Sequence, residues 1–358
     1  MNARTTFSTA ELYGVQLASG AREMIRTLPC PVCYLCGSPG SVFYSQLPDR
    51  TFGVPGKWDL RQCSNADCSL VWMDPQPHRE DITNLYSSYY THAAEPESQS
   101  RLGRMKLAIL CATLGYEHPT GVIDKVGGWV LARISLLREM GEGMILWCPS
   151  KWRGRLLDVG CGSGALLKTF AQLAWDVHGI EADPTAATLA RNGLGLDIQT
   201  GSIESGAFAT GYFDVITMSH VIEHLPDPAA ILAECYRTLR PGGHLVVVTP
   251  NCESWARRLF GRNWSAWELP RHFFLFSAGT LKSCAEKAGF RISVVRSTAR
   301  DARVAWIASL AIRRRGQLPG FRLRLTPGAM LGGVLFQAAE HLRGGRAGEE
   351  LVMIATRE

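Results

Sequence analysis

The chain lacks any long hydrophobic segment, internal repeat or low-complexity tract. No apolar run reaches about 18 residues, the length at which a helix begins to span a bilayer. The first residues are polar and include Glu11 and Arg22, so they do not resemble the apolar core of a signal peptide. These absences predict a protein with no membrane span.

An excess of charge of either sign is also lacking. The net charge is +6 in 358 residues, which permits an acidic ligand or an anionic surface but does not demand nucleic acid. A hydrophobic content of 46% with 20% charged residues describes a folded protein. A chain of this length can bury one large core with one or two small appendages.

Cysteine, in contrast, is abundant. The odd number, eleven, argues against a closed disulfide framework and favours a reducing, cytoplasmic setting. Five cysteines precede residue 69, and the other six are dispersed like ordinary core thiols: Cys111, Cys148, Cys161, Cys235, Cys252 and Cys284.

The grouped cysteines predict a metal-binding module in residues 29–79, after a polar lead-in of residues 1–28. Two cysteine knuckles suit four thiolates around one tetrahedral zinc, which leaves no open position for water. A segment shorter than roughly 40 residues cannot bury enough apolar surface to fold alone, and structural zinc makes up the deficit. The alternative is a cluster of free buried thiols. The predicted Zn²⁺ ligands are Cys33, Cys36, Cys63 and Cys68, with Cys30 as the spare.

Residues 80–151 have the pattern of helices. Two amphipathic stretches lie near 102–114 and 122–137, and Tyr86, Tyr89 and Tyr90 precede them. We predict that these helices form a cap that covers the mouth of an active site. The alternative is a contact with substrate or with a membrane surface.

From residue 152 onward, strand and helix patterns alternate. This alternation predicts an α/β fold with a mostly parallel sheet, helices on both faces, and a ligand beyond the carboxyl ends of the strands. The expected helices are 164–174, 184–192, 228–239 and 277–288. The expected strands are 155–159, 176–181, 196–199, 212–218, 243–249, 291–296 and 350–356.

A helical insertion at about 300–345 interrupts the last two strands. Its basic residues lie beside an apolar stripe, a pattern that suits an anionic lipid head group or a nucleotide-sugar diphosphate. The alternative is a solvated charged face. The basic residues are Arg313, Arg314, Arg315, Arg322 and Arg324.

The stretch Arg155–Gly164 reads R-L-L-D-V-G-C-G-S-G, an apolar strand that runs into a glycine turn and a helix start. Glycines let backbone approach a ligand closely, and a helix N-terminus faces that ligand. This corner predicts nucleotide binding.

The glycine corner, Glu181, Asp214 and the run S-H-V-I-E-H-L-P-D-P together resemble class I S-adenosylmethionine (SAM)-dependent methyltransferases, over about residues 153–298. In particular, the chain resembles the branch with an N-terminal cysteine module, which includes some sugar C-methyltransferases. The resemblance implies that residues 152–358 form a Rossmann-like seven-stranded sheet whose last strand, 350–356, is antiparallel. It also implies methyl transfer to oxygen or carbon of a small molecule, such as a sugar, a nucleotide-sugar or another secondary metabolite.

The resemblance also implies a set of SAM-binding residues. Asp158 would balance the ammonium group and Glu181 would accept the ribose hydroxyls, while Asp183 is expected to cap the next helix. Ser202 and Ile203 would meet the adenine, where the family often has an acidic residue. The turn residues Gly160, Cys161, Gly162 and Gly164 would lie against the amino-acid portion, and Ser219 and His220 would line the cofactor.

For catalysis, the same resemblance implies a histidine base, because methyl transfer needs alignment and removal of a proton from the nucleophile. His224 is the first candidate, with Glu223 as its partner, and His272 is the second. The alternative is that these histidines pack or cap helix ends. Acceptor contacts are expected from the P-R-H-F-F-L-F segment and its neighbours, with core packing as the alternative: Trp264, Trp267, Arg271 and His272.

Two competing functions remain open. Gly160-x-Gly162-x-x-Ala165 with Glu181 also fits an NAD(P)-dependent oxidoreductase, although Asp158 in the strand argues against it. A non-catalytic or RNA-directed binding protein is the other alternative, but the cysteine module has few basic residues. We therefore expect a small-molecule acceptor, anionic or lipid-linked, and no nucleic acid. Peripheral membrane contact and the oligomeric state stay open.

Overall fold

A computed structural model describes residues 25–86, 101–117, 122–206, 208–318, 327–343 and 347–358. The lead-in up to residue 24, Tyr89, Tyr90, Arg322 and Arg324 lie outside the described residues.

The central feature is a seven-stranded sheet with the order β12-β13-β10-β9-β6-β7-β8. Neighbouring strands from β10 to β8 are parallel, whereas β13 is antiparallel to both β10 and β12. The predicted α/β fold and the antiparallel last strand are thus confirmed. The strands are β6 (Arg155–Val159), β7 (Asp176–Glu181), β8 (Asp197–Thr200), β9 (Phe213–Ser219), β10 (Leu239–Pro250), β12 (Arg291–Thr298) and β13 (Glu350–Thr356).

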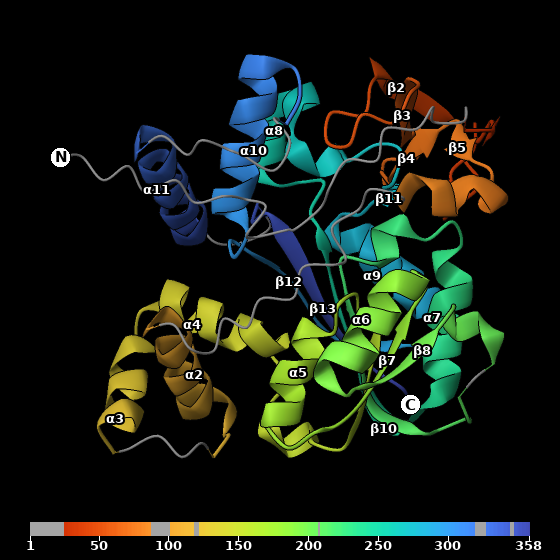
Figure 1. The fold of residues 1–358 in the computed structure, drawn as a ribbon. Coiled ribbons are helices and arrows are strands. Elements are labelled where there is room, and N and C mark those ends of the chain that lie inside the picture. Colours follow the sequence, from red (N-terminus) through yellow and green to blue (C-terminus); the bar gives the residue numbers. More distant parts are fainter. Residues whose placement is uncertain (1–24, 87–100, 118–121, 207, 319–326, 344–346) are drawn as a thin grey trace.

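Helices cover both faces of this sheet (Figure 1). Successive strand residues point to opposite faces, so Leu156 packs in one hydrophobic cluster and Leu157 in the other. Leu156 shares its cluster with helices α5 and α6, and Leu157 shares its cluster with α7 and α9. Their bounds are α5 (Ala165–Gln172), α6 (Pro184–Leu194), α7 (Pro228–Thr238) and α9 (Ala278–Lys287).

Local sequence explains where these helices begin. Asp183 accepts a hydrogen bond from the Thr185 backbone at the start of α6, and Pro184 occupies the first turn, as predicted. Ser277 and Thr280 form a reciprocal capping box at the start of α9.

The cysteine-containing segment forms a second, four-stranded sheet with the order β11-β4-β3-β2. Its edge strand β11 (Phe274–Leu275) is distant in sequence from the other three strands and pairs with β4. Buried residues of the two parts belong to one hydrophobic cluster, so residues 29–79 do not have a separate core. The remaining strands are β1 (Thr27–Leu28), β2 (Gly40–Leu47), β3 (Trp58–Cys63), β4 (Val71–Asp74) and β5 (Gln76–Pro77).

Further helices flank the main sheet in two groups (Figure 1). One group contains α2 (Arg101–Leu114), α3 (Val122–Leu131) and α4 (Ser135–Glu142). The other contains α8 (Trp255–Phe260), α10 (Ala302–Arg315) and α11 (Pro327–Arg343). No helix in the described ranges is long and apolar enough to cross a membrane.

The predicted amphipathic stretch at 122–137 is two helices, because the backbone at Ile134 is extended between α3 and α4. Its apolar stripe is exposed, with Val126, Val130 and Ile134 each more than half accessible. The periodicity identified helix but not its buried face.

Candidate active site

The glycine turn follows β6 and leads directly into α5. Gly160, Gly162 and Gly164 have φ values of 69°, 53° and 78°, a region that L side chains rarely adopt. A Cβ on Gly160 would come within 2.5 Å of Val221. A Cβ on Gly164 would approach Leu196 and Ala190, so this glycine lets α5 pack closely, whereas Gly162 faces open space.

A cavity of about 780 Å³ opens over this turn. Its volume is within the range of small-molecule sites. Helices α2 and α4 form part of its wall through Lys106, Leu107 and Met140, which is the position expected of a cap. Among the predicted cofactor residues, those that line the cavity are Asp158, Gly160, Cys161, Gly162 and Ser219.

Two buried carboxyl groups stand behind the turn. The Asp158 carboxylate accepts a hydrogen bond from Thr217 Oγ1 at 2.7 Å, and burial, with the nearby charge of Glu181, raises its pKa to about 7. Glu181 accepts hydrogen bonds from the backbone N–H groups of Gly162 at 2.7 Å and Asp183 at 2.9 Å. Burial also raises the pKa of Glu181. These contacts make Glu181 a brace for the turn, while its contact with a ribose stays a prediction.

The residues predicted to meet adenine lie at the start of a short 3₁₀ turn, Ile203–Ser205. Ser202 accepts a hydrogen bond from the Glu204 backbone, and Ile203 is buried. Within the described part of the chain, Gly164, Glu181, Ser202, Ile203 and His220 are not among the residues that line the cavity.

The predicted catalytic residues form a compact cluster elsewhere. The imidazole rings of His224 and His272 meet edge-on, with centroids 4.5 Å apart. Thr249 donates a hydrogen bond to the fully buried Glu223 carboxylate at 2.8 Å. Burial, together with the neighbouring positive groups, lowers the pKa of each histidine to about 4, so both rings are neutral at pH 7. In the described residues, none of these three side chains lines the cavity.

The expected acceptor contacts of Trp264, Trp267 and Arg271 require correction. Trp264 Nε1 donates to Glu349 and Trp267 Nε1 donates to the Gly261 carbonyl, and both rings are at most 4% exposed. The Arg271 guanidinium has no exposed surface and pairs with a carboxylate of the cysteine-containing segment. These side chains are core residues: both indole N–H groups and the guanidinium have partners inside the protein, which offset the cost of their burial.

Sequence reasoning missed a charged cluster at the ends of three different strands. Glu350, the first residue of β13, accepts hydrogen bonds from Arg300 at 3.0 and 2.9 Å and pairs with His220 Nε2 at 2.7 Å. Asp301 is adjacent, and Arg300, Asp301 and Arg303 line the cavity. The sequence signal that could have revealed this cluster is its position, because charged residues directly after strand 291–298 lie at the carboxyl edge of a parallel sheet.

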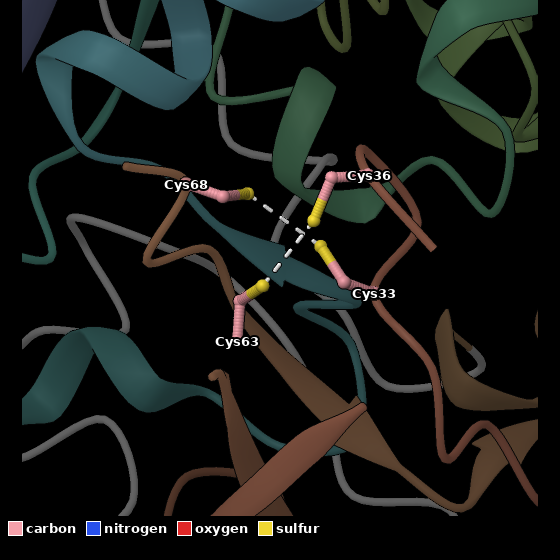
Figure 2. Close-up of side chains that lie close together, drawn as sticks. All are labelled: Cys33, Cys36, Cys63 and Cys68. Atoms are coloured by element: carbon pink, nitrogen blue, oxygen red, sulfur yellow. Dashed lines mark hydrogen bonds between the residues drawn. The ribbon is translucent and has the colours of Figure 1, made fainter. Parts of the chain in front are cut away.

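The four predicted zinc ligands converge, although they come from two separate loops (Figure 2). Cys33 Sγ lies 3.6 Å from Cys68 Sγ, and Cys36 Sγ lies 3.4 Å from Cys63 Sγ. A tetrahedron with zinc–sulfur bonds of about 2.3 Å has edges of about 3.8 Å, so the donor set fits zinc. The spare Cys30 points to the Leu28 carbonyl instead.

Comparisons with known proteins agree with this fold. Residues 135–294 match a family described as a methyltransferase domain. This part of the chain is therefore similar to methyltransferase domains.

Among curated proteins, similarity is found to two proteins named ubiquinone biosynthesis O-methyltransferase. That of Cereibacter sphaeroides is 38% identical over 134 residues, covering 35% of this chain and 54% of that protein. That of Xanthomonas oryzae pv. oryzae is 38% identical over 125 residues, covering 33% and 52%. The chain thus spans about half the length of the curated relatives it matches.

A solved SAM-dependent methyltransferase from Thermotoga maritima is 21% identical, with 66% of this chain and 96% of that chain covered and a TM-score of 0.42.

Proposed function

We propose that this chain transfers a methyl group from SAM to a hydroxyl oxygen of a small-molecule acceptor. The observation that carries the proposal is the cavity over the glycine turn, inside the matched methyltransferase domain. The names of the curated relatives favour oxygen over carbon as the methylated atom. A sugar, a nucleotide-sugar or a lipid-linked metabolite all remain within this substrate class.

The turn residues fit the amino-acid end of SAM. The open space at Gly162 admits that end, while Asp158 provides a carboxylate beneath the turn for an ammonium group. When bound, SAM supplies a methyl group already activated by its sulfonium. The protein therefore contributes mainly alignment, exclusion of water and removal of a proton.

The cavity wall favours an acceptor with an acidic group. Its lining contains two acidic residues, Asp158 and Asp301, and four basic residues: Lys106, Lys168, Arg300 and Arg303. Since Arg300 is paired with Glu350, Lys168 and Arg303 are the cations best placed to meet an anionic acceptor. A cytoplasmic setting suits both the cofactor and the free thiols that the structure describes.

We further propose that the cysteine cluster holds a structural Zn²⁺ through Cys33, Cys36, Cys63 and Cys68. Four thiolates complete the tetrahedron, so the metal would have no position left for substrate. Its role would be to hold the two cysteine loops together next to the methyltransferase domain.

Native mass spectrometry of the purified chain, with and without added S-adenosylhomocysteine or NAD, tests the cofactor assignment. We expect one bound zinc and binding of S-adenosylhomocysteine, with no binding of NAD. Binding of NAD in place of S-adenosylhomocysteine would favour the oxidoreductase alternative, which the spacing of Gly160 and Gly162 left open.

A further inference from the structure

Three chain segments meet at the carboxyl edge of the main sheet. Strand β9 ends at Ser219, and β12 ends at Thr298. Because β13 is antiparallel to both β10 and β12, β12 runs in the same direction as β10 and β9. The residues after β9, those after β12 and the first residue of β13 therefore lie at one edge, which is where parallel sheets place their ligands.

At this edge, the Glu350 carboxylate pairs with both His220 and Arg300. Both His220 ring nitrogens face carboxylates, since Nε2 lies 2.7 Å from Glu350 and Nδ1 lies 3.4 Å from Glu223. Although burial opposes it, these two contacts raise the pKa of His220 well above its usual value. Although burial opposes ionisation of Glu350 too, Arg300 and His220 lower its pKa to about 2. His220 is therefore a cation with both nitrogens engaged, which makes it unsuitable as a base.

Asp301 lines the cavity, as Arg300 does, whereas Glu350 and His220 are not among the described residues that line it. Its side chain is 48% exposed, and its contact with Arg300 Nε is long, at 4.0 Å. Asp301 precedes α10, but its side chain makes no capping hydrogen bond within the described chain. Polar atoms of Glu350 and His220 lie within 4.8 Å of its own.

We propose that Asp301 is the catalytic base of the methyl transfer, which takes the proton of the acceptor hydroxyl. The inference rests on the proposed function. The O–H bond of the acceptor breaks, its oxygen bonds to the methyl carbon, and the carbon–sulfur bond breaks with its electron pair staying on sulfur. The proton is then on an Asp301 carboxylate oxygen, from which it returns to solvent through the cavity.

The surroundings of Asp301 suit this role. The negative charge of Glu350 is the main cause that raises the pKa of Asp301, against the opposing charges of Arg300 and His220. A carboxylate with a raised pKa is a stronger base than an ordinary one. In contrast, His224 is not among the described residues that line the cavity and has a lowered pKa of about 4.

The test compares D301N with the wild-type chain in turnover and in binding. Probe acceptors are 3,4-dihydroxybenzoate and UDP-glucose, which carry hydroxyls and an acidic group, and released S-adenosylhomocysteine is the readout. We expect kcat to fall by roughly 10²–10⁴-fold in D301N. Affinity for S-adenosylhomocysteine should change by no more than a few-fold, and D301E should restore part of the turnover. E286Q, on the exposed surface of α9, is the matched control and should behave as wild type.

A pH profile separates a base from a structural residue. Wild-type kcat should fall at low pH as Asp301 is protonated, with Glu350, Arg300, His220, Arg303 and Lys106 as the surrounding charged groups. The small residual rate of D301N should lack that decline.

The outcomes are distinguishable. D301N within a few-fold of wild type overturns the proposal, and so does a greater loss in H224Q than in D301N. Transfer to neither probe overturns the assignment of a hydroxyl acceptor and this base with it, although bound S-adenosylhomocysteine would still support the cofactor site. Failure of the wild type to bind S-adenosylhomocysteine refutes the proposed function itself.

Discussion

Arg271 and Asp49 form a bidentate ion pair in which neither side chain has any exposed surface. Nη1 and Nη2 of Arg271 donate to the two Asp49 oxygens at 3.0 and 3.1 Å, across 222 residues of sequence. The Asp49 carboxylate also accepts hydrogen bonds from the backbone N–H groups of Thr51, Phe52 and Val54. The pair therefore fixes a loop of the cysteine-containing segment to the methyltransferase domain.

Breaking this pair should be strongly destabilising. R271M leaves the Asp49 charge buried without its partner, and we expect a loss of about 3–5 kcal/mol in the free energy of unfolding, measured by urea denaturation. K282M removes an exposed ion pair with Glu286 and should cost less than about 1 kcal/mol. Equal losses in the two variants would show that burial of the Arg271 pair does not matter.

Removal of zinc should loosen the same region. C63S leaves three thiolates, so we expect less than one zinc per chain by native mass spectrometry and a lower Tm that added zinc does not restore. C30S is the matched control, since Cys30 lies outside the cluster and should keep both zinc and Tm. Loss of zinc in C30S and not in C63S would reassign the ligands.

Local patterns in the sequence predicted the main sheet well. The bounds of β6, β7 and β13 agree with the expected strands because each apolar run ends at a turn or a change of charge. The glycine turn could also be predicted from the sequence. Its three glycines, at every second position, adopt positive φ values that favour glycine over other residues.

Contacts between distant segments left no such local signal. The pairing of β11 with β4 places Phe274 opposite Trp72. Similarly, no pattern in the sequence around Trp264 and Arg271 indicated that these two residues are buried in the core. Asp301 was overlooked because its place beside Glu350 and His220 depends on how three strands come together, which a single sequence shows only through the order of the sheet. The candidate cofactor turn was thus predictable, whereas the proposed base could be found only from the tertiary structure.

Addition of one methyl group at the glycine turn should abolish cofactor binding. In G160A the new Cβ would lie 2.5 Å from Val221 Cγ2, at a φ of 69° that alanine rarely adopts. We expect at least a 100-fold weaker affinity for S-adenosylhomocysteine by calorimetry, because either the turn or Val221 must shift to relieve the clash. G193A is the control, since its Cβ would meet nothing within 4 Å and the residue lies inside α6. Unchanged affinity in G160A would argue against the turn as the cofactor site.

Glu340, a buried carboxyl group on α11, should make stability depend on pH. Burial is the main cause that raises its pKa to about 8, and the charges of Glu139 and Glu350 add to it. A carboxyl group with a raised pKa in the folded state stabilises the fold below its unfolded pKa of about 4.3, and that contribution is lost as pH rises through the folded pKa near 8. E340Q cannot ionise, so its free energy of unfolding should exceed that of wild type by on the order of 2–4 kcal/mol at pH 9. The difference between the two proteins should shrink towards pH 5, as urea denaturation at pH 5, 7 and 9 would reveal. A pH-independent difference would mean that Glu340 acts through packing and not through its charge.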